Sequence, residues 1–418
     1  MRQRKRGIVA WCVYDWANSS FPAVISTFVF ATYFTEVVAP STTLGTAMWS
    51  WSVTLSALAI AILSPVLGSI ADAAGRRKPW VFVCTVLTVA ATFALWEVKP
   101  DPSYALLGLV LYGLANAGFE IGTVFYNTML ADLVPEARLG RVSGWGWGAG
   151  YAGGLVCLVL ILVLFVQTDT PLFGLGKAGY DNVRVAGPLA AIWMAVFTIP
   201  LFIWTPDAPR KSRGAVAVRR GLKELADSFR NIRHHKNILR YLIAHMIYTD
   251  GLNTLFAFGG IYAAGSFGMD TAEVVMFGIA LNITAGLGAA SFAWVDDWIG
   301  AKRTVAIALV SLTGFGAAIL LVHDKTAFWV LALFLGLFFG PAQAASRSLM
   351  ARLAPPDLRA QMFGLFAMSG KATAFIGPFL LGAVTLAFDS QRAGMATVLA
   401  FFLVGLAILW AVKEPKRD

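Results

Sequence analysis

Residues 68–78 read Gly68-Ser-Ile-Ala-Asp72-Ala-Ala-Gly75-Arg76-Arg77-Lys78, and residues 293–303 repeat this pattern as Ala293-Trp-Val-Asp-Asp297-Trp-Ile-Gly300-Ala-Lys302-Arg303. Each stretch follows a long apolar segment. The second copy departs from the first at Ala293, which replaces the glycine. Further along each half, a Leu-x-Pro sequence is followed by a glycine eleven residues after the leucine: Leu133-x-Pro135 with Gly144, and Leu353-x-Pro355 with Gly364. These repeats predict a chain built from two parallel copies of one helical unit.

The composition identifies an integral membrane protein. Of the 418 residues, 58% are hydrophobic and 13% are charged, whereas soluble domains carry about 25% charged residues. The apolar segments are long and continuous. They do not alternate over about ten residues, so we expect helices rather than barrel strands.

Twelve membrane-spanning helices can be drawn, which predicts an all-α fold of two six-helix repeats around a central cavity. The expected spans are 8–38, 44–71, 80–98, 103–130, 143–167, 186–205, 238–265, 271–295, 303–322, 327–350, 361–387 and 393–412.

The distribution of lysine and arginine predicts the orientation. Most of the 33 Lys and Arg residues lie at the N-terminus, in the loops after the even-numbered spans and in the C-terminal tail. The positive-inside rule then places both termini in the cytoplasm, and we expect a bacterial inner-membrane protein. The net charge of +10 is therefore a topology signal, and no motif for nucleic-acid binding is present.

The chain divides into an N-terminal half (1–205), a linker (206–237) and a C-terminal half (238–418), and we expect a monomer. The linker carries apolar residues at helical spacing (Val218, Leu222, Leu225, Phe229 and Ile232) with basic residues between them. Such a basic amphipathic helix is typical of a segment that lies on an anionic inner leaflet. A plain connection between the two halves is the alternative, and the two readings are compatible.

Two expected spans carry the same polar pair, Asp15-x-x-Asn18 and Asp250-x-x-Asn253. A spacing of three puts both side chains of a pair on one helix face. Both aspartates fall about 14–15 Å from a basic residue at the membrane surface, close to the midplane of the bilayer. An aspartate in hydrocarbon usually faces a bundle interior or a water-filled cavity. The pairs therefore predict a polar site at the centre of the membrane.

Other polar residues lie within the expected spans and join this candidate cavity: Glu120, Asn127, Gln343, Arg347 and Lys371. Glu120 is a candidate proton carrier, because burial favours the neutral carboxyl, and structural pairing is the alternative. Arg347 could bind a substrate carboxylate with two hydrogen bonds, or it could lock helices near the cytoplasmic gate, which we favour. Lys371 could pair with an acid of the other half.

Several stretches resemble one branch of the major facilitator superfamily. The run 68–78 is similar to the loop motif of that superfamily. More specific are Tyr14-Asp15-Trp16-Ala17-Asn18-Ser19, Ser143-Gly144-Trp145-Gly146 and Gln343-Ala344-Ala345-Ser346-Arg347-Ser348. Together they resemble the vacuolar amino-acid effluxer-like branch, which is related to autophagy-associated proteins of fungi.

The resemblance implies a secondary transporter that moves a small solute by alternating access. The relationship to amino-acid effluxers suggests an amino acid as that solute. Proton coupling is expected because buried carboxylates are available. In this reading Gly68, Asp72, Gly75, Arg76 and Arg77 belong to a gate and do not touch the substrate. A lipid-handling protein and a nutrient sensor that does not transport are the alternatives. We expect no enzyme, metal site or cofactor, because the sequence contains no HExxH, GxSxG or Walker motif and no CxxC spacing.

Overall fold

The computed structural model describes residues 2–212, 214–230, 236–269 and 271–415. The described residues form helices and connecting turns, without β-strands. The helices before the linker are α1 (Arg2–Asn18), α2 (Phe30–Tyr33), α3 (Thr42–Ala74), α4 (Lys78–Ala94), α5 (Ala105–Leu133), α6 (Leu139–Ile161), α7 (Asp181–Arg184) and α8 (Ala186–Trp204). The linker contains α9 (Gly214–Arg230), and it is followed by α10 (Lys236–Phe267), α11 (Thr271–Ile299), α12 (Ala301–Leu321), α13 (Lys325–Leu353), α14 (Arg359–Ser369), α15 (Ile376–Phe388) and α16 (Gln391–Trp410).

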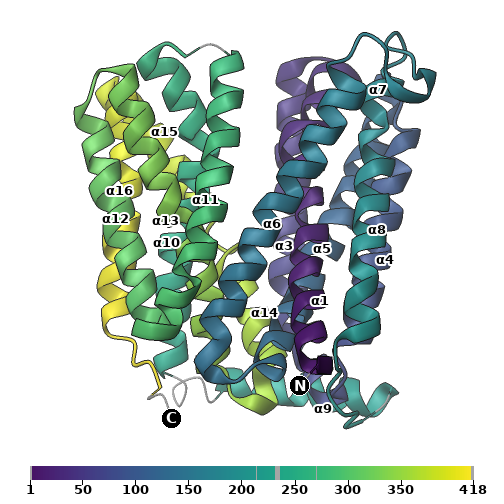
Figure 1. Cartoon of the computed structure of the whole chain (residues 1–418), viewed down its shortest axis with the longest axis vertical. Helices are drawn as coiled ribbons and strands as arrows, with labels where there is room; N and C mark the ends of the chain where they lie inside the picture. Colours follow the sequence, from purple (N-terminus) through teal and green to yellow (C-terminus); the bar gives the residue numbers. More distant parts are fainter. Residues whose placement is uncertain (1, 213, 231–235, 270, 416–418) are drawn as a thin grey trace.

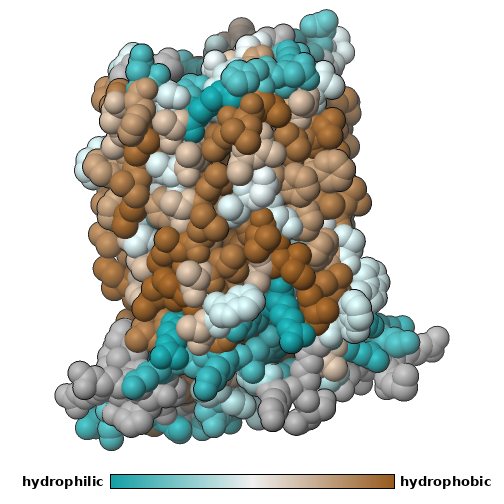
Figure 2. Space-filling view, turned by 90° about the vertical axis from the view of Figure 1, so that its left-hand side faces the viewer, coloured by the Kyte–Doolittle hydropathy of each residue, from teal (hydrophilic) through white to brown (hydrophobic). Residues whose placement is uncertain are grey.

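The helices form two groups that stand side by side (Figure 1). We call α1–α8 the first bundle and α10–α16 the second bundle. Both termini and α9 lie at the same end of the molecule, which we call the basal face, and α7 lies at the opposite, distal face. The side view shows an apolar belt between two hydrophilic ends (Figure 2), as expected for helices whose outer surfaces contact lipid.

Ten helical segments are long and apolar enough to cross a membrane, by length and composition, among the residues that the structure describes. The second bundle differs from the expected spans in two places. Helix α10 has 32 residues but carries Arg240, His245, Asp250 and Asn253, so it falls outside that set. The count of twelve spans and the six-helix repeat therefore remain predictions.

The prediction of one continuous helix over 361–387 was wrong, because this segment forms two helices with a turn between them. α14 ends at Ser369, a turn follows, and α15 begins at Ile376. The hydroxyl of Ser369 donates to the carbonyl of Phe366 at 2.7 Å, which occupies a backbone acceptor of the last turn. Gly370 follows, and glycine disfavours a helix interior. The interruption places Lys371 on a turn at the level of the membrane interior.

The hydrophobic core is continuous at the basal side and divided at the distal side. One cluster of buried apolar residues includes Trp11 and Tyr126 of the first bundle together with Tyr241, Leu349 and Phe363 of the second. The distal half of the first bundle has a separate cluster around Phe21, Phe34 and Tyr112. The two bundles thus share a packed core near the basal face, and the space between them lies toward the distal face.

Candidate functional site

A cavity of about 420 Å³ lies between the two bundles, and we call it the polar cavity. Its polar lining comes from α1 and the segment directly after it, and from α5, α6, α10, α11 and α13. It consists of Asp15, Asn18, Ser19, Thr27, Glu120, Thr123, Asn127, Trp147, Tyr151, Asn253, Asn282, Gln343 and Arg347. The structure therefore brings seven of the nine predicted cavity residues to one site. Asp250 and Lys371 do not line it.

Arg347 joins the bundles at the floor of the polar cavity, and its side chain is only 3% exposed. From α13, its Nη1 donates to Asp15 Oδ2 on α1 at 2.9 Å and to Asn127 Oδ1 on α5 at 3.4 Å. Its Nε donates to Ser143 Oγ on α6 at 2.9 Å, and its Nη2 donates to the Ser143 carbonyl at 2.6 Å. One guanidinium thus binds three helices of the first bundle.

Aromatic rings surround the same guanidinium. Its central carbon lies 4.7 Å from the ring centre of Trp11, 5.5 Å from that of Trp147 and 6.0 Å from that of Tyr126. Arginine is the side chain best suited to combine planar stacking with several hydrogen bonds. Since all three of its nitrogens already donate to the first bundle, this geometry favours a lock between helices over a free binding site for a carboxylate.

A second ion pair connects the bundles at Glu120, which lines the polar cavity. Lys371 Nζ lies 2.6 Å from Glu120 Oε1, with side chains 31% and 21% exposed. Glu120 belongs to α5 and Lys371 to the turn between α14 and α15. The interruption of that helix is what lets the lysine reach across. Both side chains are more exposed than that of Arg347, which is 3% exposed.

Asp250 occupies a different environment from Asp15, although the two share a sequence pattern. Its carboxylate is directed at α15, where Oδ2 accepts the Gly377 N–H at 3.3 Å, and the residue is 2% exposed. Asn253, one turn further, lines the polar cavity. The prediction that both aspartates face one central cavity is therefore wrong for Asp250, because α15 begins beside it and takes up its carboxylate.

His245, also on α10, is an interior residue with a hydrogen-bond partner. Its Nδ1 lies 2.8 Å from Ser369 Oγ, and its ring stacks on Phe366 with 3.9 Å between centres. His245 is therefore a packed polar residue of the second bundle.

An apolar cavity of about 490 Å³ continues the site toward the distal face. It shares Thr27, Phe28, Phe256, Asn282 and Phe339 with the polar cavity, and it extends to Met269, Val274, Phe277 and Phe328 at the distal ends of the second-bundle helices. Sequence reasoning missed this chamber. It also missed Trp147 and Tyr151, which lie in the glycine-rich part of α6.

The basal side of the site is closed by the loop that ends α3. Asp72 accepts the backbone N–H groups of Ala360 at 3.1 Å and Gln361 at 2.7 Å, and both belong to the first turn of α14 in the other bundle. Its partner within the loop is Arg77, whose Nη2 lies 2.6 Å from Asp72 Oδ1. Arg76, the other predicted gate arginine, is exposed.

The two predicted gate glycines of this loop have different roles. Gly68 packs so closely on α14 that a methyl group there would clash with the Ala360 carbonyl. Gly75 adopts φ +91, a conformation that favours glycine, where α3 ends. Beyond it, Lys211 of the linker pairs with Asp357 at 2.7 Å. This hydrogen bond lowers the pKa of the exposed Asp357 carboxyl below its ordinary value.

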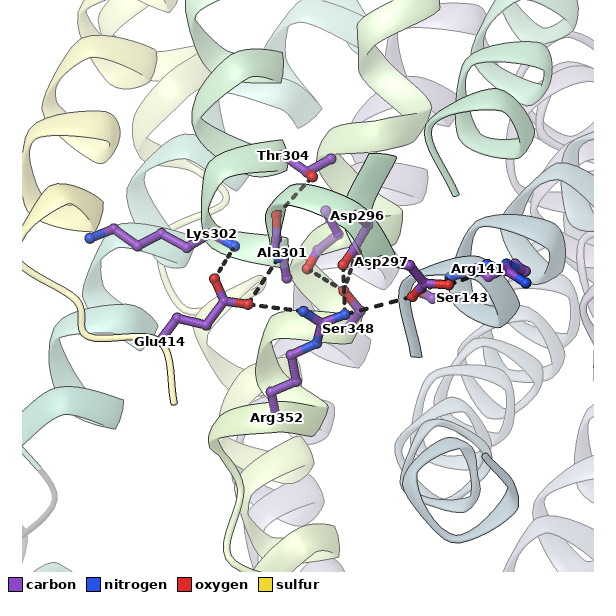
Figure 3. A network of polar contacts seen from close by, with 12 residues as sticks. Arg141, Ser143, Asp296, Asp297, Ala301, Lys302, Thr304, Ser348, Arg352 and Glu414 are labelled. Carbon is purple, nitrogen blue, oxygen red and sulfur yellow. Dashed lines mark hydrogen bonds and ion pairs between the residues drawn. The ribbon is translucent and has the colours of Figure 1, made fainter. Parts of the chain in front are cut away.

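The loop that ends α11 makes a related network (Figure 3). Asp297 accepts the Arg141 N–H at 3.1 Å, at the start of α6 in the first bundle. Arg352 lies between Asp296, at 2.8 Å, and Glu414 of the C-terminal tail, at 3.0 Å. Glu414 also accepts the N–H groups of Ala301 and Lys302, which begin α12. The basal face is therefore held by buried charges on both bundles.

A helical membrane protein with a polar cavity between two bundles and a charged basal closure has the architecture of a major facilitator transporter. Solved structures agree. The proton:xylose symporter XylE, bound to 6-bromo-6-deoxy-D-glucose, superimposes with a TM-score of 0.74 over 99% of this chain and 96% of that chain, at 14% identity. A bacterial homologue of the iron transporter ferroportin, in an outward-facing state, superimposes with a TM-score of 0.69 over 98% and 99%, at 13% identity. These likenesses show the fold.

The family follows from sequence. Residues 37–417 match the family described as "Vacuole effluxer Atg22 like", and the chain belongs to that family. The "Uncharacterized MFS-type transporter YxiO" of Bacillus subtilis is 25% identical over 410 residues, covering 97% of this chain and 94% of the relative. Autophagy-related protein 22 of Kluyveromyces lactis is 22% identical, covering 88% and 80%. The chain spans about half (51%) of the length of Autophagy-related protein 22-1 of Penicillium rubens, at 26% identity. Fold and relatives together support a multi-pass membrane transporter and are consistent with a protein that is not an enzyme.

Proposed function

We propose that this protein is a secondary active transporter that carries a small solute by alternating access to the polar cavity. The observation that carries the proposal is a cavity lined by charged and amide side chains of both bundles, with Arg347 bonded across its floor. Halves 1–205 and 238–418 would move as units about this site, joined by the linker 206–237. The basic residues near the termini and in the linker support a cytoplasmic basal face.

The solute class follows from relationship. Because the family resembles vacuolar amino-acid effluxers, amino acids are the first solutes to test. Purified protein in proteoliposomes should exchange a labelled amino acid for an unlabelled one across the membrane. A panel of sugars and peptides serves as the comparison. Binding of a solute without any exchange would favour a sensor, and absence of both binding and exchange would contradict a transporter of these solutes.

Proton coupling is the second part of the proposal, and Glu120 is its carrier. Protonation of Glu120 would release Lys371 from their 2.6 Å contact, so proton binding and an inter-bundle bond are linked at one carboxylate. Glu120→Gln should abolish uptake driven by a pH gradient while leaving exchange intact. Wild-type uptake that ignores a pH gradient and follows a sodium gradient would refute proton coupling.

A further inference from the structure

We infer that the polar cavity binds an ammonium group through Asp15 and Asn18, and that the substrate is an amphipathic ammonium compound whose apolar body fills the apolar cavity. The inference rests on the proposed transport function and names the substrate chemistry of the same site.

The first observation is an unused acceptor on α1. Asn18 is 4% exposed and lines the polar cavity. Its Nδ2 donates to Thr123 Oγ1 at 3.4 Å, whereas its Oδ1 has no partner among the described residues. A buried acceptor without a donor is unfavourable. A donor carried by a ligand would satisfy it.

The second observation is the carboxylate one turn below. Asp15 lies three residues before Asn18 and on the same helix face. Its Oδ2 accepts from Arg347, and the side chain keeps 15% of its surface exposed where it lines the polar cavity. A primary ammonium has three donors and no acceptor. It can therefore donate to the carboxylate and to the amide oxygen together.

The third observation concerns the cations. Arg347 is the one Lys or Arg side chain among the described residues that line the polar cavity. Its guanidinium already donates to Ser143, Asp15 and Asn127. A substrate carboxylate would have to displace these bonds, whereas an ammonium meets acceptors that are already in place. The cavity thus favours the amine end of a ligand over an acid end.

The apolar cavity accounts for the rest of the ligand. It is about 490 Å³, and it adjoins the polar cavity, with which it shares the side chains of Phe28, Phe256 and Phe339. The rings of Phe256 and Phe339 lie 5.7 Å apart between centres. Sites of several hundred Å³ with an apolar lining and a few convergent polar groups are typical for amphipathic small molecules.

The position of Asp15 also connects binding to the basal closure. Its carboxylate would be shared between the ligand and Arg347, so an ammonium draws charge away from a bond that joins α1 to α13. Ligand binding would then weaken the lock at the cavity floor. This is the change that a carrier needs before its basal side can open.

The test compares three probes of equal body: 2-phenylethylamine, L-phenylalanine and 3-phenylpropanoate, with the protein in lipid nanodiscs. The amine and the amino acid should bind, and the acid that lacks the ammonium should bind at least tenfold more weakly. Lengthening the apolar body from ethylamine to hexylamine should tighten binding. Binding of 3-phenylpropanoate equal to that of the amine, or absence of binding by every amine, overturns the inference.

Variants locate the site. Asn18→Ala, which leaves the bond between Asp15 and Arg347 in place, should weaken amine binding roughly tenfold, as expected for a lost bond to a charged group. Asp15→Asn should weaken amine binding more than Asn18→Ala does. If Asp15→Asn does not fold, the result for Asn18→Ala alone tests the assignment. Asp101→Asn removes an exposed acid outside the cavity and is the matched control. Unchanged binding in Asn18→Ala overturns the assignment. Exchange of any solute in proteoliposomes tests transport separately. If the protein exchanged solutes but bound them equally with and without an ammonium group, this inference would be refuted and the proposed transport function would stand.

Discussion

Asp72 near the end of α3 and Asp297 near the end of α11 each accept backbone hydrogen bonds from the first turn of a helix in the opposite bundle. Asp72 binds Ala360 and Gln361 of α14, and Asp297 binds Arg141 of α6. A carboxylate at a helix N-terminus is favourable because the unpaired N–H groups and the helix dipole both attract it. The two loops therefore make the same kind of contact in opposite directions.

The glycine that permits close helix packing lies on the loop's own helix, α3, at the first contact and on the opposite helix, α6, at the second. In the first, Gly68 of α3 faces the backbone of Ala360. In the second, Ala293 of α11 faces a helix that contains Gly144, where an added methyl group would lie 2.6 Å from the Ala293 Cβ. Close approach needs a small residue on at least one helix. The departure of the second loop from the glycine pattern is thus compensated on α6 and does not weaken the contact.

The charges differ more than the packing. Asp72 depends on one arginine of its own loop, with side chains 1% and 6% exposed for Asp72 and Arg77. The second loop contains two aspartates, and it draws on Arg352 of α13 and on Glu414 of the tail (Figure 3). The buried charge of the first closure is therefore concentrated in one pair, beside the more exposed ion pairs of Arg359 with Asp132 and of Lys211 with Asp357. The buried charge of the second closure is distributed.

The largest effect is expected for Asp72→Ala compared with Asp297→Ala. Loss of Asp72 leaves the Arg77 guanidinium buried without its carboxylate, which costs about 3–5 kcal/mol. Loss of Asp297 should cost less, about 1–3 kcal/mol. Its partner Arg141 is already partly exposed, and Arg352 keeps its bond to Asp296. Alkylation of a single cysteine at Ala345, buried at the contact of α6 and α13, measures opening on a background without Cys12, Cys84 and Cys157. Equal labelling of both variants would contradict a concentrated first closure.

Arg77→Ala should follow, at about 1.5–3 kcal/mol, because Asp72 keeps its two backbone donors when the arginine is removed. Arg76→Ala is the matched control, since that side chain is exposed. The same labelling rates compare the two. An effect of Arg76→Ala as large as that of Arg77→Ala would show that the exposed arginine takes part in the gate.

Gly68→Ala should cost about 1–3 kcal/mol, because the added methyl group overpacks α3 against α14. The reverse change, Ala293→Gly, should cost about 1 kcal/mol or less, since it removes a methyl group and lowers helix propensity. Thermal unfolding in detergent measures both. A Gly68→Ala variant as stable as wild type would mean that α14 can move away without loss.

Glu414→Gln should have a smaller effect, of about 1 kcal/mol, because the charge at the start of α12 is lost while the side-chain shape is kept. Asp207→Asn is the counterpart in the first bundle, where Asp207 accepts the N–H groups of Arg77 and Lys78 at 2.8 and 3.2 Å. Since Glu414 also binds Arg352, its variant should increase labelling at Ala345 more than Asp207→Asn does. The opposite order would place the tail outside the closure.

The smallest effect is expected for Asp357→Asn. The Lys211 hydrogen bond lowers the pKa of Asp357, so this pair stabilises the closed face above the ordinary carboxyl pKa of 3.8 and is lost as pH falls through the lower folded value. Wild-type labelling should rise slightly below about pH 4, and the variant should lack that component. A large change at pH 7, or one that high salt does not reduce, would be inconsistent with an exposed ion pair.

Sequence patterns predicted most of the residues that line the polar cavity. The depth of a residue in the membrane and the helix face on which it lies both follow from its position along a span. Asp15, Asn18, Glu120 and Arg347 meet as their positions along the spans suggested. Asp250 could not be separated from Asp15, because its environment is set by the start of α15. The interruption that creates this start depends on packing around Ser369 and Gly370.

The gate arginine shows a second limit of sequence reasoning. Spacing alone did not distinguish Arg76 from Arg77. The positive φ of Gly75 turns the chain so that Arg77 points back to Asp72. Trp147 and Tyr151 were missed for another reason. They carry no charge and lie among glycines on α6, so no sequence signal distinguishes them from residues that pack against other helices.

The bonds from Asp72 to α14 have a consequence for how the chain is made. The residues that they connect are separated by 288 and 289 positions in the sequence. These bonds therefore cannot form until almost the whole protein has left the ribosome. The bond from the Arg77 N–H to Asp207 at the start of α4, by contrast, requires no residue of the second bundle. Domains generally fold as units during synthesis, and the first bundle would therefore enter the membrane with Asp72 held by Arg77 alone. The bonds between Asp72 and α14 would then form only when the second bundle docks on the first, and this docking would produce the closed carrier.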